Sequence, residues 1–123
     1  MIKIDDWVIE KGEKAQGKIE IIGCGMAMPA TVICGAEDGP TILITAGIHS
    51  AEYVGIQAAI ELAKEFQPEE LKGNVIIIPL VNVSGFEHRT MSMVYEDGKN
   101  LNRVFPGIPE GTAAERIACT IVR

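Results

Sequence analysis

A histidine and a glutamate three residues apart are the side chains whose types and spacing first suggest chemistry in this sequence. His49 and Glu52 stand between an apolar run, Thr41 to Ala46, and the start of a helix-like pattern, with Gly47 ending the run. Residues at i and i+3 share one face of a helix, and ligands of open α/β sheets gather beyond the carboxyl ends of the strands. An imidazole and a carboxylate placed there would supply two of the three protein ligands of a hydrolytic zinc site.

A second group of polar side chains lies in an irregular stretch further along the chain. Asn102 and Arg103 are adjacent there, and Arg89 is another cation of the same stretch. An arginine can pair with a substrate carboxylate or steady a developing oxyanion. These three residues are therefore the candidates for substrate binding, whereas no residue of the sequence is marked as the general base.

Each assignment has a plainer alternative. An H-x-x-E pair often occurs by chance, although its place after a glycine at a strand end favours the metal-site interpretation. An ordinary solvated loop arginine is the alternative for Arg103, and His88, the only other histidine, is interpreted as a surface residue. Gly23-Cys24-Gly25 lacks the third glycine and the following helix of a dinucleotide loop, so a turn between strands is the better interpretation there.

The apolar pattern predicts an α/β arrangement that would position these residues. The expected strands are 18–22, 28–34, 41–46 and 74–80, and the expected helices are 51–66 and one that begins at a Thr112–Glu115 capping box. The strand-helix-strand order around the first helix predicts a parallel pair. The apolar stripes of the two helices are expected to include Val54 and Val122 respectively.

The connecting segments are expected to be less regular. Residues 1–17 are interpreted as a polar lead-in that ends in a loop at 10–17, and Glu37–Pro40 carries a strong turn signal. Residues 81–110 are rich in glycine, proline and asparagine. Apolar residues are interleaved with these, which predicts an ordered functional loop.

Composition bounds the class of protein. A chain of 123 residues allows one domain, and 47% hydrophobic with 23% charged residues is typical of globular proteins. A net charge of -6 argues against non-specific nucleic-acid binding. No apolar run reaches the ~18 residues that cross a membrane, and no signal-peptide pattern opens the chain. We therefore expect a cytoplasmic protein without nucleic-acid or membrane partners, and buried free thiols at Cys24, Cys34 and Cys119.

Four segments of the chain resemble the succinylglutamate desuccinylase/aspartoacylase family, a branch of the zinc carboxypeptidase superfamily. They are GPTILITAGIHSAEYVGIQAA, NVIIIPLVNVSGF, DGKNLNRVFPG and the helix start TAAERIA. They occur in the family's order and spacing and together cover about residues 17–123. The segment Asp97 to Gly107 is the most specific of them, and the resemblance extends only to the N-terminal portion of a family member.

The resemblance implies a fold, a cofactor and an activity. The implied fold is a three-layer α/β/α domain with a mixed, largely parallel sheet, truncated at residue 123. One Zn²⁺ would be bound by His49 and Glu52, and Asn102 with Arg103 would bind the substrate's carboxylate. The implied reaction is hydrolysis of the amide bond of N-acyl amino acids or related amides by a zinc-bound water.

The chain departs from the family pattern in three respects. Ser50-Ala51 stand where the family often has Gly-Asp, and Met91 stands where an arginine is common; Arg89, two residues earlier, is the candidate for that role. The family's third ligand and catalytic glutamate would follow residue 123. We therefore expect only part of an active site here, and a non-catalytic scaffold or interaction module of the same fold is the alternative. A sheet cut at this point would expose an edge, which favours self-association.

Overall fold

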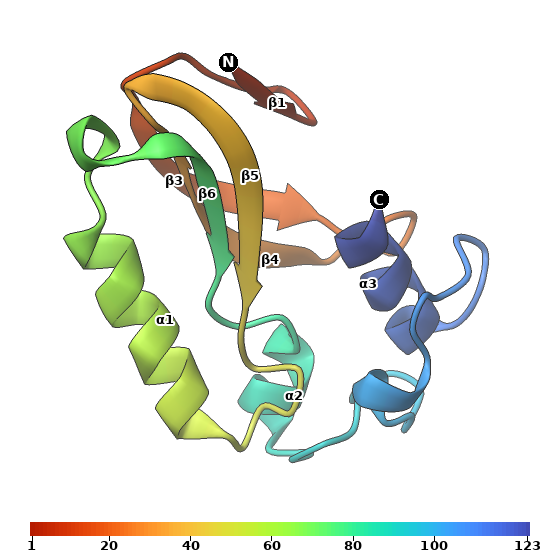
Figure 1. The fold of residues 1–123 in the computed structure, drawn as a ribbon. Coiled ribbons are helices and arrows are strands. Elements are labelled where there is room, and N and C mark those ends of the chain that lie inside the picture. Colours follow the sequence, from red (N-terminus) through yellow and green to blue (C-terminus); the bar gives the residue numbers. More distant parts are fainter.

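A mixed four-stranded sheet organises the computed structural model, which describes residues 1–123 (Figure 1). The strand order is β3-β4-β6-β5. The strands are β3 (Lys14–Glu20), β4 (Ala27–Cys34), β5 (Glu37–Thr45) and β6 (Lys72–Ile78). The predicted mixed sheet and the predicted parallel pair, β5 with β6, are confirmed. The parallel share is smaller than expected, because β3–β4 and β4–β6 are antiparallel.

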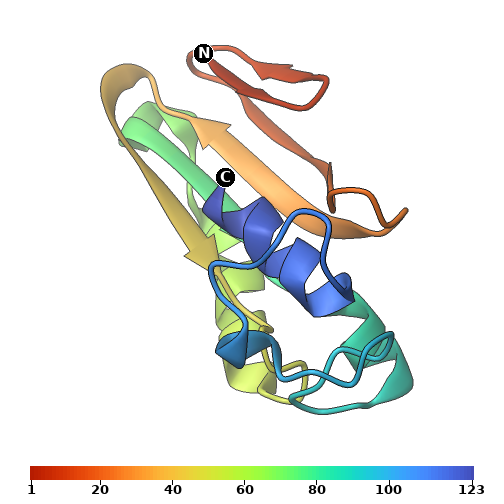
Figure 2. The same cartoon turned by 90° about the vertical axis from the view of Figure 1, so that its right-hand side faces the viewer.

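Helices cover both faces of this sheet. Helix α1 (Tyr53–Glu65) lies on one face and α3 (Ala113–Val122) on the other, as the two views in Figures 1 and 2 show. Helix α2 (Val83–His88) and the 3-10 turns η1 (Pro68–Glu70) and η2 (Leu101–Arg103) belong to the connections. The three-layer α/β/α arrangement is therefore confirmed. No helix combines the length and the apolar character needed to span a bilayer.

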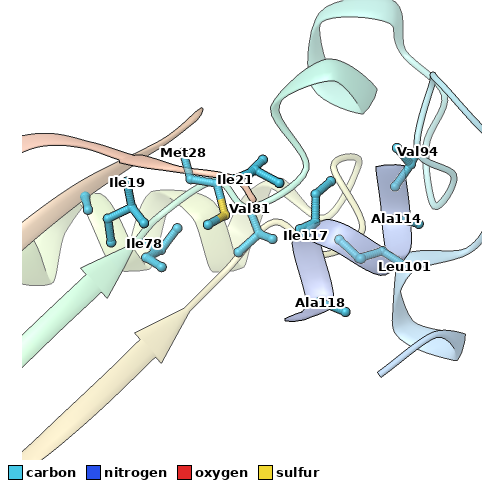
Figure 3. Packing of buried hydrophobic residues seen from close by; sticks show 11 residues of the cluster. Ile19, Ile21, Met28, Ile78, Val81, Val94, Leu101, Ala114, Ile117 and Ala118 are labelled. Carbon is cyan, nitrogen blue, oxygen red and sulfur yellow. The ribbon is translucent and has the colours of Figure 1, made fainter. Parts of the chain in front are cut away.

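The second half of strand β6, residues 75–78, is apolar because it is covered on both sides. Val75 and Ile77 pack with Ala59 and Ala63 of α1. Ile78 points to the opposite face and joins the larger core beneath α3 (Figure 3). Successive side chains of a strand alternate between the faces of its sheet, so β6 contributes to two separate cores.

The N-terminal segment is a hairpin, not a polar lead-in. Strands β1 (Ile2–Ile4) and β2 (Trp7–Ile9) pair antiparallel, and Trp7 and Ile9 pack against the α3 face of the sheet. Strand β3 begins at Lys14, within the segment expected to be a loop. Gly17 makes room for the hairpin, since a Cβ there would lie 2.1 Å from the Trp7 ring. The few apolar side chains of this polar segment are enough to pack the hairpin on the sheet. The pattern of residues 1–17 gives no sign of that packing.

The expected turn at Glu37–Pro40 is wrong in position. These residues open strand β5, and the pairing with β6 shifts register between Glu37 and Thr41. The chain reverses just before, between β4 and β5. Glycine permits this irregularity, because Gly73 of β6 has φ +90 and a Cβ there would meet the Pro40 carbonyl oxygen at 2.1 Å.

Both helical stripes differ from expectation at one end. Val54 is 86% exposed, and Ile56 is buried with Ala59 and Ala63 instead. Helix α1 begins two residues later than expected, and its buried face runs through Ile56, Ala59 and Ala63, so Val54, two residues before Ile56, lies on the opposite side of the helix. Val122, the last residue of α3, is also exposed.

All three cysteines are free thiols. Cys34 and Cys119 are buried, as expected, and Cys24 is partly exposed. Strand β5 forms one edge of the sheet and leaves Ile42 and Leu43 about half exposed. The expected exposed edge is thus present, and self-association through it stays a prediction.

The start of α3 follows the capping box. The Glu115 Oε1 accepts hydrogen bonds from the Thr112 backbone N–H at 3.0 Å and from the Thr112 hydroxyl at 2.8 Å. These two bonds, supported by the Lys99 ammonium, lower the pKa of the Glu115 carboxyl. Asp97 Oδ2 adds a bond from the Ala114 N–H at 2.7 Å. Asp97 thereby joins the loop before α3 to its first turn.

We predict that Glu115→Gln destabilises the protein at neutral pH and much less at acid pH. Because the folded-state pKa lies below the unfolded value near 4.5, the carboxylate stabilises the fold above that pH. This contribution is lost as the pH falls through the folded-state pKa. Urea unfolding of both proteins between pH 7 and pH ~3 should show the stability gap closing. Glu65→Gln, at an exposed site, serves as the control, and a gap that is the same at every pH would contradict the assignment.

Candidate metal and substrate site

The junction between β5 and α1 carries the two predicted metal ligands. Beyond the end of β5, the Ala46 N–H still donates to Ile78 O at 2.9 Å, so the chain remains attached to β6. Gly47 then adopts φ +69, where a Cβ would crowd Leu80 at 2.8 Å. The Glu52 N–H donates to His49 O at 3.1 Å and closes a turn before α1. His49 therefore lies just past the carboxyl end of β5, and Glu52 immediately precedes the helix.

The side chains of His49 and Glu52 point toward each other. The His49 Nδ1 lies 2.7 Å from the Glu52 Oε2, with the histidine side chain 29% and the glutamate side chain 71% exposed. The other ring nitrogen, Nε2, lies 2.9 Å from the Oδ1 of Asn100. Both nitrogens of one imidazole thus face oxygen atoms.

The asparagine determines which ring nitrogen carries a proton. Asn100 Oδ1 also accepts from the Asn102 backbone N–H at 3.1 Å, which identifies this atom as the acceptor oxygen. His49 Nε2 must then be the donor. The distance of 2.7 Å from Nδ1 to the Glu52 Oε2 is that of a direct contact and leaves no room for an ion between the two atoms. A metal ion would replace this contact by binding to the Nδ1 lone pair and to the carboxylate, and a histidine ligand whose other nitrogen donates to an oxygen is the usual arrangement at metal sites. The donor set fits Zn²⁺.

Turn η2 brings the asparagines to this site. Leu101 is fully buried in the core beneath α3, where Figure 3 shows it beside Ala114 and Ile117. The residues on either side of it, Asn100 and Asn102, lie next to the β5–α1 junction. Asn102 lines the same open cavity of about 840 Å³ as His49 and Glu52. The structure therefore brings together three of the five predicted site residues.

The two predicted arginines do not line this cavity. Arg103 follows Asn102 in η2, with its side chain exposed and in no ion pair. Arg89 is the C-cap of α2, has φ +56 and is also exposed. His88 stacks on Tyr95 with ring centroids 3.6 Å apart and is exposed, in agreement with its interpretation as a surface residue.

His49 and Glu52, the two proposed metal ligands, have no third ligand beside them in the structure. No group of three or more histidine, cysteine, aspartate or glutamate side chains in the structure is arranged to hold a metal ion. His49 and Glu52 would therefore bind a metal together with water or with a ligand from outside residues 1–123.

Sequence reasoning missed two residues that shape the site. Asn100 orients His49 and lies within the motif Asp97 to Gly107, two positions before Asn102, so its place in the motif was an available signal. Tyr53 lines the cavity and packs edge-to-face on Phe86, with centroids 6.0 Å apart. No sequence signal marked Tyr53, because Phe86 is far away along the chain.

The comparison with protein families agrees with this geometry. Residues 38–123 match the model of the succinylglutamate desuccinylase/aspartoacylase catalytic domain. The chain belongs to this family. It is 41% identical over 112 residues to the N-alpha-acetyl-L-2,4-diaminobutyric acid deacetylase of Halomonas elongata, an alignment that covers 89% of this chain and 30% of that one.

Solved structures of family members share the fold. A succinylglutamate desuccinylase/aspartoacylase from Rhodobacter sphaeroides superimposes with a TM-score of 0.80 at 32% identity, covering 94% of this chain and 38% of the other. The product-bound ectoine utilization protein EutE (DoeB) from Ruegeria pomeroyi gives a TM-score of 0.80 at 32% identity, covering 92% and 36%. The chain thus spans between 30% and 38% of the length of these three relatives.

Proposed function

We propose that this chain is the metal- and substrate-binding part of a zinc-dependent hydrolase that cleaves the amide bond of N-acyl amino acids or related amides. The observation that carries the proposal is the His49 imidazole held between Glu52 at 2.7 Å and Asn100 at 2.9 Å. An imidazole and a carboxylate side by side at the cavity, with the other ring nitrogen bonded to Asn100, support a metal ion that would replace their direct contact, and membership of a deacylase family supports the amide substrate.

The residues have separate roles in this proposal. His49 and Glu52 hold the zinc ion, which supplies an activated water and polarises the scissile carbonyl. Asn102, on the cavity wall, donates its amide to the substrate's carboxylate. Arg103 and Arg89 do not line the cavity; in this proposal they attract the anionic substrate from a distance, and both are exposed and free of ion pairs. The general base has to come from outside residues 1–123.

We predict that His49→Ala and Glu52→Ala each abolish specific zinc binding. Removing a direct ligand is expected to weaken the affinity by roughly a hundredfold or more, since even partners of the ligands are worth ~10–100-fold. Zinc affinity is measured by competition with a chromophoric chelator. His88→Ala removes the other histidine, which stacks on Tyr95 away from the cavity, and should bind zinc as the unmodified chain does. Undiminished zinc binding in both His49→Ala and Glu52→Ala would end the proposal.

The second candidate, a non-catalytic scaffold or interaction module, is favoured by the absence of a third ligand. Hydrolysis by residues 1–123 alone would exclude the scaffold. The relative from Halomonas elongata makes N-acetyl-2,4-diaminobutyric acid the first substrate to test, by following release of acetate with and without zinc. Zinc-dependent hydrolysis that His49→Ala removes supports the enzyme. Zinc binding without hydrolysis by residues 1–123 agrees with both candidates, because the proposed enzyme takes its general base from outside these residues.

A further inference from the structure

Ser50, between the two proposed zinc ligands, makes an unusual double contact. Its backbone N–H donates to the carbonyl oxygen of Met91 at 2.9 Å, and its hydroxyl donates to the same oxygen at 2.8 Å. The residue is only 2% exposed, so water does not compete for either bond. Two donors from one residue therefore attach the His49–Glu52 turn to a loop 41 residues away in sequence.

The loop that provides this acceptor is itself held in place. Met91 has φ +63, a conformation that side chains rarely adopt. The Thr90 N–H donates to Gly85 O at 3.0 Å, which joins the loop to α2. The Asn82 side chain donates to Met93 O at 3.1 Å and to Ile48 O at 3.4 Å. The turn is consequently attached on one side through Ile48 and on the other through Ser50.

We propose that Ser50 is a positioning residue for the metal site, and that its hydroxyl holds His49 and Glu52 in the geometry that binds zinc. The inference rests on the proposed zinc site and adds to it a residue that makes no contact with the metal. Rotation of the backbone at Ser50 would move the imidazole relative to the carboxylate, because Ser50 lies between them. A ligand pair that is held before binding loses less entropy when the ion arrives.

A pair of isosteric variants isolates the hydroxyl. Ser50→Thr keeps the hydroxyl, whereas Ser50→Val has the shape of the threonine variant and lacks the hydroxyl. The zinc affinity of the Thr variant should lie within about threefold of the original, and that of the Val variant should fall about tenfold, the range found for partners of metal ligands. Without zinc, amide hydrogen exchange at residues 49–52 should be faster in the Val variant. Ser84→Ala, which removes a hydroxyl bonded to Glu96, is the control and should change neither.

The possible results separate the two proposals. Equal zinc affinity in the Thr and Val variants, with zinc binding lost in His49→Ala, would overturn the role of Ser50 and leave the proposed function standing. Zinc binding retained in His49→Ala would overturn the proposed function itself. A Val variant that fails to fold beside a folded Thr variant would show that the hydroxyl supports the fold instead, which also overturns the positioning role. If neither folds, the smaller variant Ser50→Ala, which lacks the hydroxyl, is compared with the unmodified chain by the same criteria.

Discussion

Replacing Asn82 by aspartate is expected to destabilise the protein by about 3 kcal/mol or more. Asn82 is fully buried, and its Oδ1 caps α2 by accepting from the Gly85 N–H at 3.1 Å. Its Nδ2 donates to the carbonyl oxygens of Met93 and Ile48. Aspartate would keep the cap but would place a charged oxygen against two carbonyl oxygens, without water to separate them.

The measurement is the free energy of unfolding in urea at pH 7. Asn74→Asp is the matched control, since Asn74 donates to the Thr41 hydroxyl at 3.0 Å at an exposed site. That hydroxyl can donate in return to an aspartate, so the control should change stability by less than ~0.5 kcal/mol. Asn82 also bonds Ile48, the neighbour of His49, so the variant should weaken zinc binding where it remains folded. Similar stabilities for the two variants would refute this account of Asn82.

Gly107→Ala is expected to have an effect of similar size through backbone crowding. Gly107 has φ +84, and a Cβ there would lie 2.2 Å from Glu115 O and 2.5 Å from Cys119 N. Both atoms belong to the backbone of α3, so no side-chain rotation relieves the overlap. The left-handed conformation contributes ~1–2 kcal/mol and the forced displacement a further ~1–3 kcal/mol.

Gly98→Ala separates these two contributions. Gly98 has φ +67, close to that of Gly107, but no heavy atom lies within 4 Å of the position that an alanine methyl group would occupy there. It should therefore lose only the ~1–2 kcal/mol of the backbone conformation. Thermal and urea unfolding of both variants give the comparison. Equal losses would mean that α3 can move away from residue 107 without penalty, contrary to the close packing of Gly107 on that helix.

Features that depend on neighbours in the chain were predicted well from the sequence. The capping box at Thr112 and Glu115 forms, because its two partners are three residues apart. The strand expected at 74–80 is present as Lys72–Ile78, since a continuous apolar run requires cover on both faces. Likewise, Gly47 followed by His49 and Glu52 makes a strand-to-helix junction with both side chains on one side. Residues that specify their own local conformation can be interpreted without coordinates.

Features that depend on distant partners were missed or misplaced. Trp7 and Ile9 belong to a segment without a clear pattern, and their burial depends on a sheet formed later in the chain. Val54 was assigned to the apolar stripe of its helix, but the buried face runs through Ile56, Ala59 and Ala63, and Val54 lies on the opposite side. The two arginines satisfied the chemistry of substrate binding, but the cavity beside His49 receives Asn102 and neither guanidinium.

The amino-acid order was sufficient to specify the β5–α1 junction, the two proposed ligands that it carries and the start of α3, because each depends on residues within a few positions of one another. The orientation of His49 was not specified in that way. It depends on Asn100, 51 residues away, and on a turn attached to Met91 and Asn82. Hydrogen bonds between segments so distant exist only after the sheet and α3 have packed, since Leu101 must be buried before its neighbouring asparagine can reach the imidazole.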